Sequence, residues 1–383
     1  MMMKKRTSRV WMILLLWAAL FAVITGCSNP ASSPSPKASV GNGNPVEGGS
    51  TASGDSSQNQ PKLAKSLNLF IWSEYIPTSV LEAFEKEYGV KVNISTYSSN
   101  EEMFAKLSVH SAGYDLAVAS DYMVDLMRKQ QLMEKLDFAN IGNIQNIGPE
   151  FLKRSADPEG AYSVPYMWGN VLIAVNTEKV RVPVASYRDL LRPEFKDSLV
   201  VLDDSRSMIG IANQMQGKSL NETDPAALEK SKELLRQLLP NIKAFDSDSP
   251  KTMLVTGEVA AGIVYGAEAS LARQENPKIQ AVLPEEGMEL WQDNFIIPKG
   301  SPNKLTAETF INFVLRPEIS AEISKHYPYA NPNLAAHELI DKEVLEDPAV
   351  YPPKEELAKG EYMIDIGEAA TLYDRIWSEI KLE

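Results

Sequence analysis

The chain has 383 residues, a formal net charge of −13 and a single cysteine, Cys27. Such an acidic balance makes a protein a poor partner for nucleic acid, so no nucleic-acid binding is expected. The lone cysteine near the N-terminus excludes an intrachain disulfide, a cysteine metal cluster and a thiol catalyst in the folded part. The length of the chain favours two lobes over one core.

The N-terminus has the pattern of a targeting segment. Four basic residues precede an apolar stretch over residues 10–24: Lys4, Lys5, Arg6 and Arg9. The stretch is shorter than the roughly 20 residues that a membrane-spanning helix needs. It ends at Gly26-Cys27, which resembles the bacterial lipoprotein signal, in which the cysteine is lipidated and becomes the new N-terminus. We therefore expect residues 1–27 to be a lipoprotein signal peptide; the alternative is an ordinary secretion signal with a stray cysteine.

Residues 28–66 have the composition of a flexible linker. They are rich in Ser, Pro, Gly and Asn and contain no aromatic residue. Such a stretch cannot bury enough apolar surface to offset its conformational entropy. Its root-mean-square reach is on the order of 35 Å. It would hold a folded body near the outer face of the cytoplasmic membrane without fixing its orientation.

Strands and helices alternate in the first part of the folded region. Strands are expected over residues 67–72, 90–95 and 115–119, and helices over 77–88, 101–110 and 122–129. Pro77 in the first turn and Gly89 after the last are typical of helix ends. Asn100 is a candidate cap for the second helix. This βαβαβα order predicts a mostly parallel sheet covered by helices.

The alternation returns in the second part of the chain. Strands are expected over residues 198–203, 260–265 and 280–283, and helices over 226–238 and 367–382. The last helix has an expected buried stripe of Ala370, Leu372, Ile376 and Ile380. Two extended apolar segments, 168–175 and 291–298, are expected to cross between two α/β lobes.

Aromatic and acidic residues gather where the predicted strands end. Ligands of open α/β sheets bind beyond the carboxyl ends of the strands. The residues at these positions are Trp72, Ser73, Glu74, Tyr75, Ser120, Tyr122, Asp204, Ser247, Tyr265, Glu268, Trp291, Asp293 and Tyr329. Aromatic faces attract alkylammonium groups. Because each buried ammonium also needs a carboxylate, the mixture predicts a site for an organic cation with several amines.

Each of these residues also has a purely structural interpretation. Trp72 and Trp291 are equally typical of core aromatics, and Asp204 of a helix N-cap. A single carboxylate in a loop, such as Glu74, is most often solvated. The prediction of a binding site therefore depends on the convergence of the whole set at one face.

Eight segments carry a resemblance to a known family. They are residues 72–77 (WSEYIP), 95–107 (STYSSNEEMFAKL), 114–127 (YDLAVASDYMVDLM), 163–169 (SVPYMWG), 203–206 (DDSR), 245–248 (FDSD), 291–293 (WQD) and 331–336 (NPNLAA). In order and spacing they resemble the spermidine/putrescine-binding proteins of bacterial polyamine ABC transporters. The resemblance implies an α/β, two-lobed periplasmic-binding-protein fold of type II, with a ligand cleft between lobes joined by hinge strands. It divides the chain into lobe 1, residues 67–170 plus 294–331, and lobe 2, residues 171–293 plus 332–383.

The resemblance also assigns roles to the site residues. An aromatic box would consist of Trp72, Tyr75, Tyr122, Tyr265, Trp291 and Tyr329. The acids would be Glu74, Asp204 and Asp293, and the polar contacts Ser73, Ser120 and Ser247.

Four positions depart from the family pattern. Spermidine-type members carry Glu at Ser207 and Gln at Met363, and Tyr265 replaces a Trp. Glu268 stands where putrescine-type members place an Asp. The choice between spermidine, putrescine and a longer amine is therefore open.

By resemblance, the chain would capture a polyamine by cleft closure and deliver it to the permease subunits of an ABC transporter, as a monomer without cofactor or metal. An enzyme is a rival, but adjacent Asp203 and Asp204 on a strand point to opposite faces. The three histidines show no metal spacing, and no phosphate loop or dinucleotide glycine pattern occurs. The same fold with another cationic ligand, and a polyamine sensor, remain alternatives.

Overall fold

The computed structural model describes residues 62–383. The predicted signal peptide with Cys27, and the predicted linker up to residue 61, lie outside the described residues. Within residues 62–383, no helix combines the length and apolar character needed to cross a membrane.

The first half of the described region is built as the alternating pattern predicts. Strand β1 pairs in parallel with β2 on one side and with β3 on the other. The elements are β1 (Ser66–Trp72), α1 (Thr78–Tyr88), β2 (Lys91–Tyr97), α2 (Asn100–His110), β3 (Leu116–Ser120) and α3 (Asp121–Lys129). The predicted strands and helices are thus confirmed to within about two residues. Gly89 ends α1 with a φ of 66°, the left-handed conformation that glycine adopts at no steric cost.

The second half repeats the same construction. Strand β5 lies between β6 and β7 and is parallel to both, while β8 pairs antiparallel with β4. The elements are β5 (Leu199–Val201), α4 (Ser205–Gln214), α5 (Pro225–Leu238), β6 (Ile242–Phe245), α6 (Lys251–Val255), β7 (Ala261–Tyr265), α7 (Gly266–Glu275) and β8 (Ile279–Val282).

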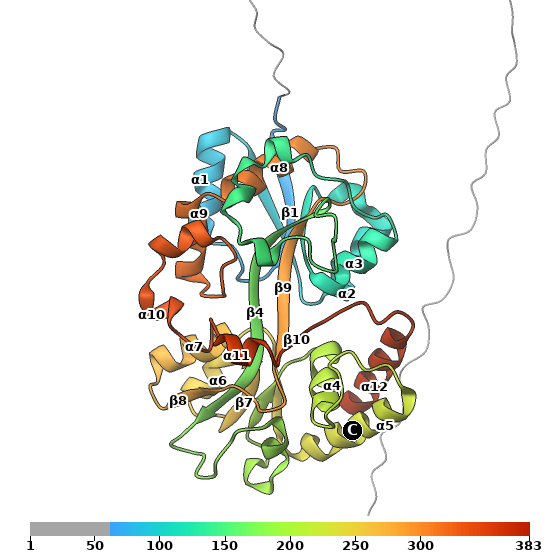
Figure 1. The fold of residues 1–383 in the computed structure, drawn as a ribbon, viewed down its shortest axis with the longest axis vertical. Coiled ribbons are helices and arrows are strands. Elements are labelled where there is room, and N and C mark those ends of the chain that lie inside the picture. The colour runs from blue at the N-terminus through green and yellow to red at the C-terminus, as the bar shows by residue number, and fades with distance from the viewer. Residues whose placement is uncertain (1–61) are drawn as a thin grey trace, which may run out of the picture. The chain divides into compact units, whose positions relative to one another are not determined.

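Two long strands run through both halves. Strands β4 (Ser163–Asn176) and β9 (Glu289–Ile296) pair antiparallel in the middle of one continuous sheet of order β2-β1-β3-β9-β4-β7-β5-β6. Figure 1 shows them passing from the upper group of elements to the lower one. They coincide with the two predicted crossing segments. Because one sheet is shared, a cleft between the halves has β4 and β9 at its base.

The chain after β9 visits both halves. Helices α8 (Lys304–Val314) and α9 (Pro317–His326) cover the first half, whereas α12 (Ala369–Leu382) lies beside α4 in the second (Figure 1). Between them come a 3-10 turn (Leu334–Leu339), α10 (Lys342–Leu345), α11 (Lys354–Leu357) and β10 (Glu361–Tyr362). Ala336 in that turn packs against Ala321 of α9. The chain thus still contacts the first half beyond residue 331, where the resemblance divides the lobes; the division itself stays a prediction.

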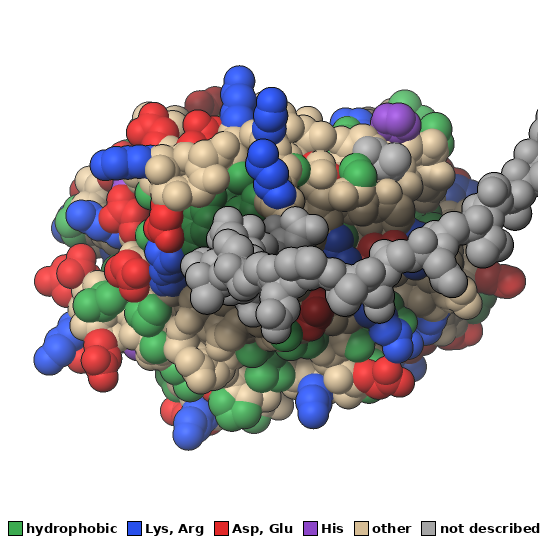
Figure 2. Space-filling model, turned by 90° about the horizontal axis from the view of Figure 1, so that it is seen from above, with side chains coloured by type: hydrophobic (Ala, Val, Ile, Leu, Met, Phe, Trp, Pro, Cys, Tyr) green, Lys and Arg blue, Asp and Glu red, His purple; other side chains and the backbone are tan. Residues whose placement is uncertain are grey.

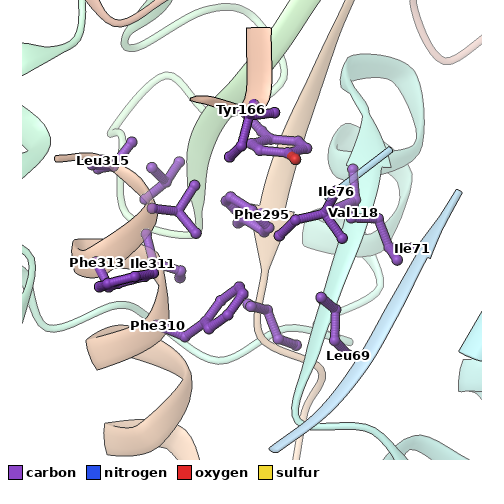
Figure 3. Packing of buried hydrophobic residues seen from close by; sticks show 14 of the residues in the cluster. Leu69, Ile71, Ile76, Val118, Tyr166, Phe295, Phe310, Ile311, Phe313 and Leu315 are labelled. Carbon is purple, nitrogen blue, oxygen red and sulfur yellow. The ribbon is translucent and has the colours of Figure 1, made fainter. Parts of the chain in front are cut away.

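Each half has its own buried core. In the first half, Phe310 of α8 packs toward Phe295 of β9, as Figure 3 shows, whereas Phe313 packs on Phe84 of α1. In the second half the core includes the buried residues of α12: Tyr373, Ile376, Trp377 and Ile380. Ala370 and Leu372 are only partly buried, so the predicted stripe of this helix was half wrong. A large core of its own in each half is the packing expected of two lobes.

Charges on the surface are mixed. Figure 2 views the molecule from above, and on the visible part of that face basic and acidic side chains are interspersed. This face therefore contrasts with the cavity described next, whose lining is dominated by carboxylates.

Candidate binding site

A cavity of about 220 Å³ lies between the two halves. All of the predicted ligand-binding residues line it: Trp72, Ser73, Glu74, Tyr75, Ser120, Tyr122, Asp204, Ser247, Tyr265, Glu268, Trp291, Asp293 and Tyr329. The structure thus brings the whole set together. Their roles in binding a ligand stay a prediction.

The sheet explains why these residues meet. Strands β1 and β3 of the first half end at Trp72 and Ser120. Strand β7 of the second half runs in the opposite direction and ends at Tyr265, so that the strand ends of the two halves face one another across the cavity. Strand β9 passes beneath them, and because alternate residues of a strand share a face, Trp291 and Asp293 point the same way. Trp291 packs on Gly169 of β4, where an added Cβ would come within 2.5 Å of the indole ring. Any side chain larger than hydrogen at this position would displace the indole.

Asp293 is a buried carboxylate of the cavity that is held by two hydroxyl groups. The Tyr75 hydroxyl donates to Asp293 Oδ2 at 2.8 Å, and the Ser120 hydroxyl donates to Oδ1 at 2.6 Å. Asp293 is only 5% exposed, and this burial raises its pKa to about 6, although both hydroxyl donors act in the opposite direction. The two donors hold the carboxylate in one orientation without neutralising it, which leaves it able to bind a cation.

Asn100 supports this arrangement and was misassigned from the sequence. Its side-chain amide donates to Ser120 Oγ at 3.0 Å, and its amide oxygen accepts from the Ser120 backbone N–H. The cap of α2 is instead Ser99, which accepts from the Glu102 backbone N–H. The predicted capping role of Asn100 was therefore wrong, because two adjacent residues of capping type compete and tertiary contacts take one of them.

The aromatic residues form a continuous row through the cavity. The ring centroid of Tyr329 lies 5.5 Å from those of both Tyr75 and Trp291, and Trp291 lies 5.9 Å from Tyr265. All three pairs meet edge to face, an arrangement that turns successive faces and edges toward the enclosed space. Methylene groups and alkylammonium groups both pack favourably on such walls.

Acids lie beside the aromatic residues of the cavity. Near Tyr329, exposed Glu74 has a φ of 50° and buried Glu268 has a pKa raised to about 7, mainly by burial and further by the Glu74 carboxylate. Near Tyr122, Asp204 Oδ1 accepts from the Ser207 backbone N–H at 2.8 Å. Asp204 is thus both an N-cap of α4 and part of the cavity wall, so the two interpretations of this residue are compatible.

The serines differ in what their hydroxyls do. Ser120 is bound to Asp293, as described above. Ser247 Oγ accepts from the Asp203 backbone N–H at 2.9 Å and so ties two loops of the second half together. Ser73 is exposed at the cavity wall. Among residues 62–383 no group of three or more His, Cys, Asp or Glu side chains is arranged to hold a metal ion.

The lining residues that were not predicted from the sequence as ligand contacts include one acid and one further aromatic residue. Glu289 lies on β9, four residues before Asp293, and Tyr362 lies on β10. The alternation Glu289-Trp291-Asp293 was visible in the sequence and could have identified the glutamate. Tyr362 carried no such signal, because it reaches the cavity only through the pairing of β10 with β9.

Contacts beside the cavity and in its wall join the two halves at its mouth. Lys129 of α3 forms an ion pair with Asp365 at 2.9 Å, and the Arg154 guanidinium lies 3.5 Å over the Tyr362 ring. Arg206 of α4 lies 4.8 Å over the Tyr122 ring. These contacts link first-half residues to α4 and to the C-terminal segment, so the structure has the halves in contact with one another.

Comparison with known proteins identifies the family. A family model described as bacterial extracellular solute-binding protein matches residues 79–352. The chain belongs to this family. It is 41% identical over 317 residues to the spermidine/putrescine-binding periplasmic protein of Salmonella typhimurium, covering 82% of this chain and 91% of that one. These findings confirm the family resemblance inferred from the sequence.

Solved structures support the same assignment. The solute-binding chain is 36% identical to the spermidine/putrescine ABC transporter substrate-binding protein PotD from Streptococcus pneumoniae, with a TM-score of 0.72 over 83% of this chain and 99% of that one. It is 30% identical to the TpPotD lipoprotein of Treponema pallidum, with a TM-score of 0.75 over 83% of this chain and all of the other. The predicted two-lobed α/β fold is confirmed by these neighbours.

Proposed function

We propose that this solute-binding protein captures a polyamine in the cleft between its halves and delivers it to an ABC transporter. The observation that carries the proposal is the charge of the cavity. Eight carboxylate side chains line it, against a single lysine, Lys251. Two of the eight, Asp121 and Asp203, are ion-paired with Arg154 and Lys381, which leaves six. Carboxylates gathered in a partly buried space repel one another, so a multiply charged cation is the ligand that this cavity would favour most.

The arrangement of the acids favours a polyamine over a compact cation. Glu74 and Glu268 lie near Tyr329, whereas Asp293 accepts from the Tyr75 hydroxyl. Asp204 lies near Tyr265, so that each acid or pair of acids has an aromatic ring beside it. A polyamine has the same alternation, because its ammonium groups are separated by methylene chains. Aromatic walls pack the methylenes, while separate carboxylates receive the separate charges.

Closure of the halves would complete the site. Tyr75, Tyr122 and Tyr329 belong to the first half, and Asp204 and Tyr265 to the second, so a ligand between them would hold the halves together. Closure excludes water and strengthens every charge–charge contact inside. We place the moving bodies at residues 67–170 plus 294–331 and at residues 171–293 plus 332–383.

Calorimetric titration with di-, tri- and tetraamines, using sugars and amino acids as controls, tests this function. Only the amines are expected to bind. The double variant Trp291→Ala, Asp293→Ala should lose polyamine binding while its circular dichroism spectrum stays unchanged. Near-normal affinity in that variant would exclude this cavity as the site, and a sugar or amino acid that binds best would exclude the ligand class.

The remaining parts of the proposal concern the cell. Cys27 would carry the lipid anchor, residues 28–66 would tether the body to the membrane, and the closed monomer would dock on the permease subunits. No catalysis is expected. Replacement of Cys27 by Ala should release the protein from membranes in a fractionation experiment without changing polyamine affinity; retention of the variant in the membrane fraction would argue against the anchor.

A further inference from the structure

Strand β9 presents a third residue to the cavity besides Trp291 and Asp293. Because alternate residues of a strand share a face, Glu289 lies on the same face as both. The intervening Gln292 points the other way, where its amide donates to the Phe151 carbonyl and to Asn294 Oδ1. The face of β9 that lines the cavity therefore carries an acid, an aromatic residue and a second acid in succession.

The Glu289 carboxylate is buried and only half satisfied. The side chain is 2% exposed, and its Oε1 accepts from the Ser207 hydroxyl at 3.1 Å. Its Oε2 has no hydrogen-bond partner, and among residues 62–383 no lysine, arginine or histidine lies within ion-pair distance of it. Burial, with Asp204 nearby, raises the pKa of Glu289 to about 8. A buried carboxylate normally has a cationic partner that offsets the cost of its burial, and Glu289 has none.

We propose that Glu289 is a further ligand-binding residue, whose carboxylate receives one terminal ammonium group of a triamine while Asp293 receives the central one. This inference rests on the proposed polyamine function. It assigns the opposite terminal ammonium to the end of the cavity where Glu74 and Glu268 lie.

The spacing of the acids suits a ligand longer than a diamine. Four residues of strand separate the Cα atoms of Glu289 and Asp293 by roughly 13 Å. With carbon–carbon bonds of about 1.5 Å, an extended diamine with four methylenes reaches roughly 6 Å and a triamine with a further aminopropyl arm roughly 11 Å. A diamine can pair with Asp293 and with one end of the cavity only. A triamine can pair with Asp293 and with both ends at once.

A structural role for Glu289 is the competing explanation. Arg206 lies on the adjacent helix α4, and its Nε also lacks a partner, although another guanidinium nitrogen donates to the Ile364 carbonyl at 2.9 Å. A small movement could pair Glu289 with Arg206 inside the protein. Such a pair would stabilise the free protein, whereas a buried carboxylate that has no cationic partner until a ligand binds would destabilise it. The two explanations therefore predict opposite changes in stability.

The variant Glu289→Gln separates them. Glutamine keeps the size of the side chain and still accepts from Ser207, but it cannot carry the charge. Its matched control is Glu308→Gln, because Glu308 is 1% exposed, lies outside the cavity and accepts from the Asp137 backbone N–H and from Asn140. Affinities for the diamine putrescine and the triamine spermidine are measured by calorimetry at pH 8, and the melting temperature is measured without ligand.

We expect Glu289→Gln to weaken triamine binding at least tenfold and diamine binding less than threefold, because the diamine can use the other acidic end. The melting temperature of the free variant should equal or exceed that of the parent. Glu308→Gln should lower the melting temperature and leave both affinities unchanged. Glu289→Asp, which keeps the charge, should bind the triamine more tightly than Glu289→Gln does.

Several results would overturn the inference. They are an unchanged triamine affinity in Glu289→Gln, equal losses for both amines, a lower melting temperature with both affinities intact, or no advantage of Glu289→Asp over Glu289→Gln. A parent protein that binds the diamine but not the triamine would overturn it and leave the proposed function standing. A parent protein that binds no amine would instead remove the proposed function itself.

Discussion

The two acids on the cavity face of β9 differ in how the protein surrounds them. Asp293 receives hydroxyl donors from Tyr75 and Ser120, and burial raises its pKa only to about 6. Glu289 receives a single hydroxyl, and its pKa rises to about 8. The two carboxyl groups are similarly buried but differ in pKa, because hydrogen-bond donors to the charged form offset the cost of desolvation. Asp293 is therefore the more readily ionised of the two in the free protein, whereas on the proposal above Glu289 would lose its proton when the ligand binds.

Removal of the Asp293 carboxylate should have the largest effect on polyamine affinity. Asp293→Asn should weaken binding of every polyamine at least a hundredfold, because taking away one partner of a buried charge pair costs about 3–5 kcal/mol. Calorimetry measures the loss. Asp115→Asn is the control, since Asp115 is equally buried but accepts from the Asn68 backbone N–H far from the cavity. Comparable losses in both variants would mean that buried aspartates act through general stability.

The difference in pKa should appear as a pH dependence. The amines stay protonated between pH 6 and 8, as lysine does. In the same window Glu289 and Glu268 hold protons that a bound ammonium would displace. Affinity should therefore rise on the order of tenfold or more from pH 6 to pH 8, with protons released on binding. Titrations in two buffers of different ionisation enthalpy measure the release; an affinity that falls over this range would contradict the assignment.

Loss of a donor should make Asp293 more like Glu289. Tyr75→Phe removes the hydroxyl on Oδ2, so the pKa of Asp293 should rise further. Because a hydrogen bond to a charged group contributes about 1.5–3 kcal/mol, we expect roughly tenfold weaker binding at pH 6 and a smaller loss at pH 8. Tyr166→Phe is the matched control, since the Tyr166 hydroxyl donates to the Tyr75 carbonyl and not to Asp293. Equal losses at both pH values would show that Tyr75 acts by packing alone.

The contacts at the mouth should matter least. Asp365→Asn breaks the ion pair with Lys129, which is partly exposed, and exposed pairs contribute about 0–1 kcal/mol. Polyamine affinity should fall less than threefold, mainly through faster release measured by stopped-flow fluorescence. Glu87→Gln breaks a comparable exposed pair with Arg316 inside the first half and should change nothing. If Asp365→Asn lowered polyamine affinity more than tenfold, the contacts at the mouth, and not those inside the cavity, would determine how firmly the halves close.

Much of the fold was predictable from short-range patterns, but α4 was not. The strands that carry Trp72 and Tyr265 show apolar runs bounded by polar residues, so their ends were located to within a residue. In α4, from Arg206 to Gln214, every residue is buried. Several of these buried residues are polar, and their partners come from distant parts of the chain, as where Asn213 donates to the Tyr373 hydroxyl. Such tertiary contacts cannot be inferred from local sequence.

The cavity was predictable as a set of strand ends, whereas its balance of charge was not. Spermidine-type members of the family carry a glutamate where this chain has Ser207. From the sequence alone, the chain therefore lacks an acid at this position. The structure places the Glu289 carboxyl group on the Ser207 hydroxyl, so an acidic side chain reaches the same place from a different element. Position-by-position comparison cannot detect this, because the two residues are 82 positions apart in the chain.

The most direct test is a crystal structure of the protein with a bound triamine at pH 8. The central nitrogen is predicted to lie within hydrogen-bonding distance of Asp293, one terminal nitrogen beside Glu289 and the other near Glu74 and Glu268, with the methylenes along Trp291. A ligand bound outside this cavity, or amine nitrogens directed away from these carboxylates, would contradict the account.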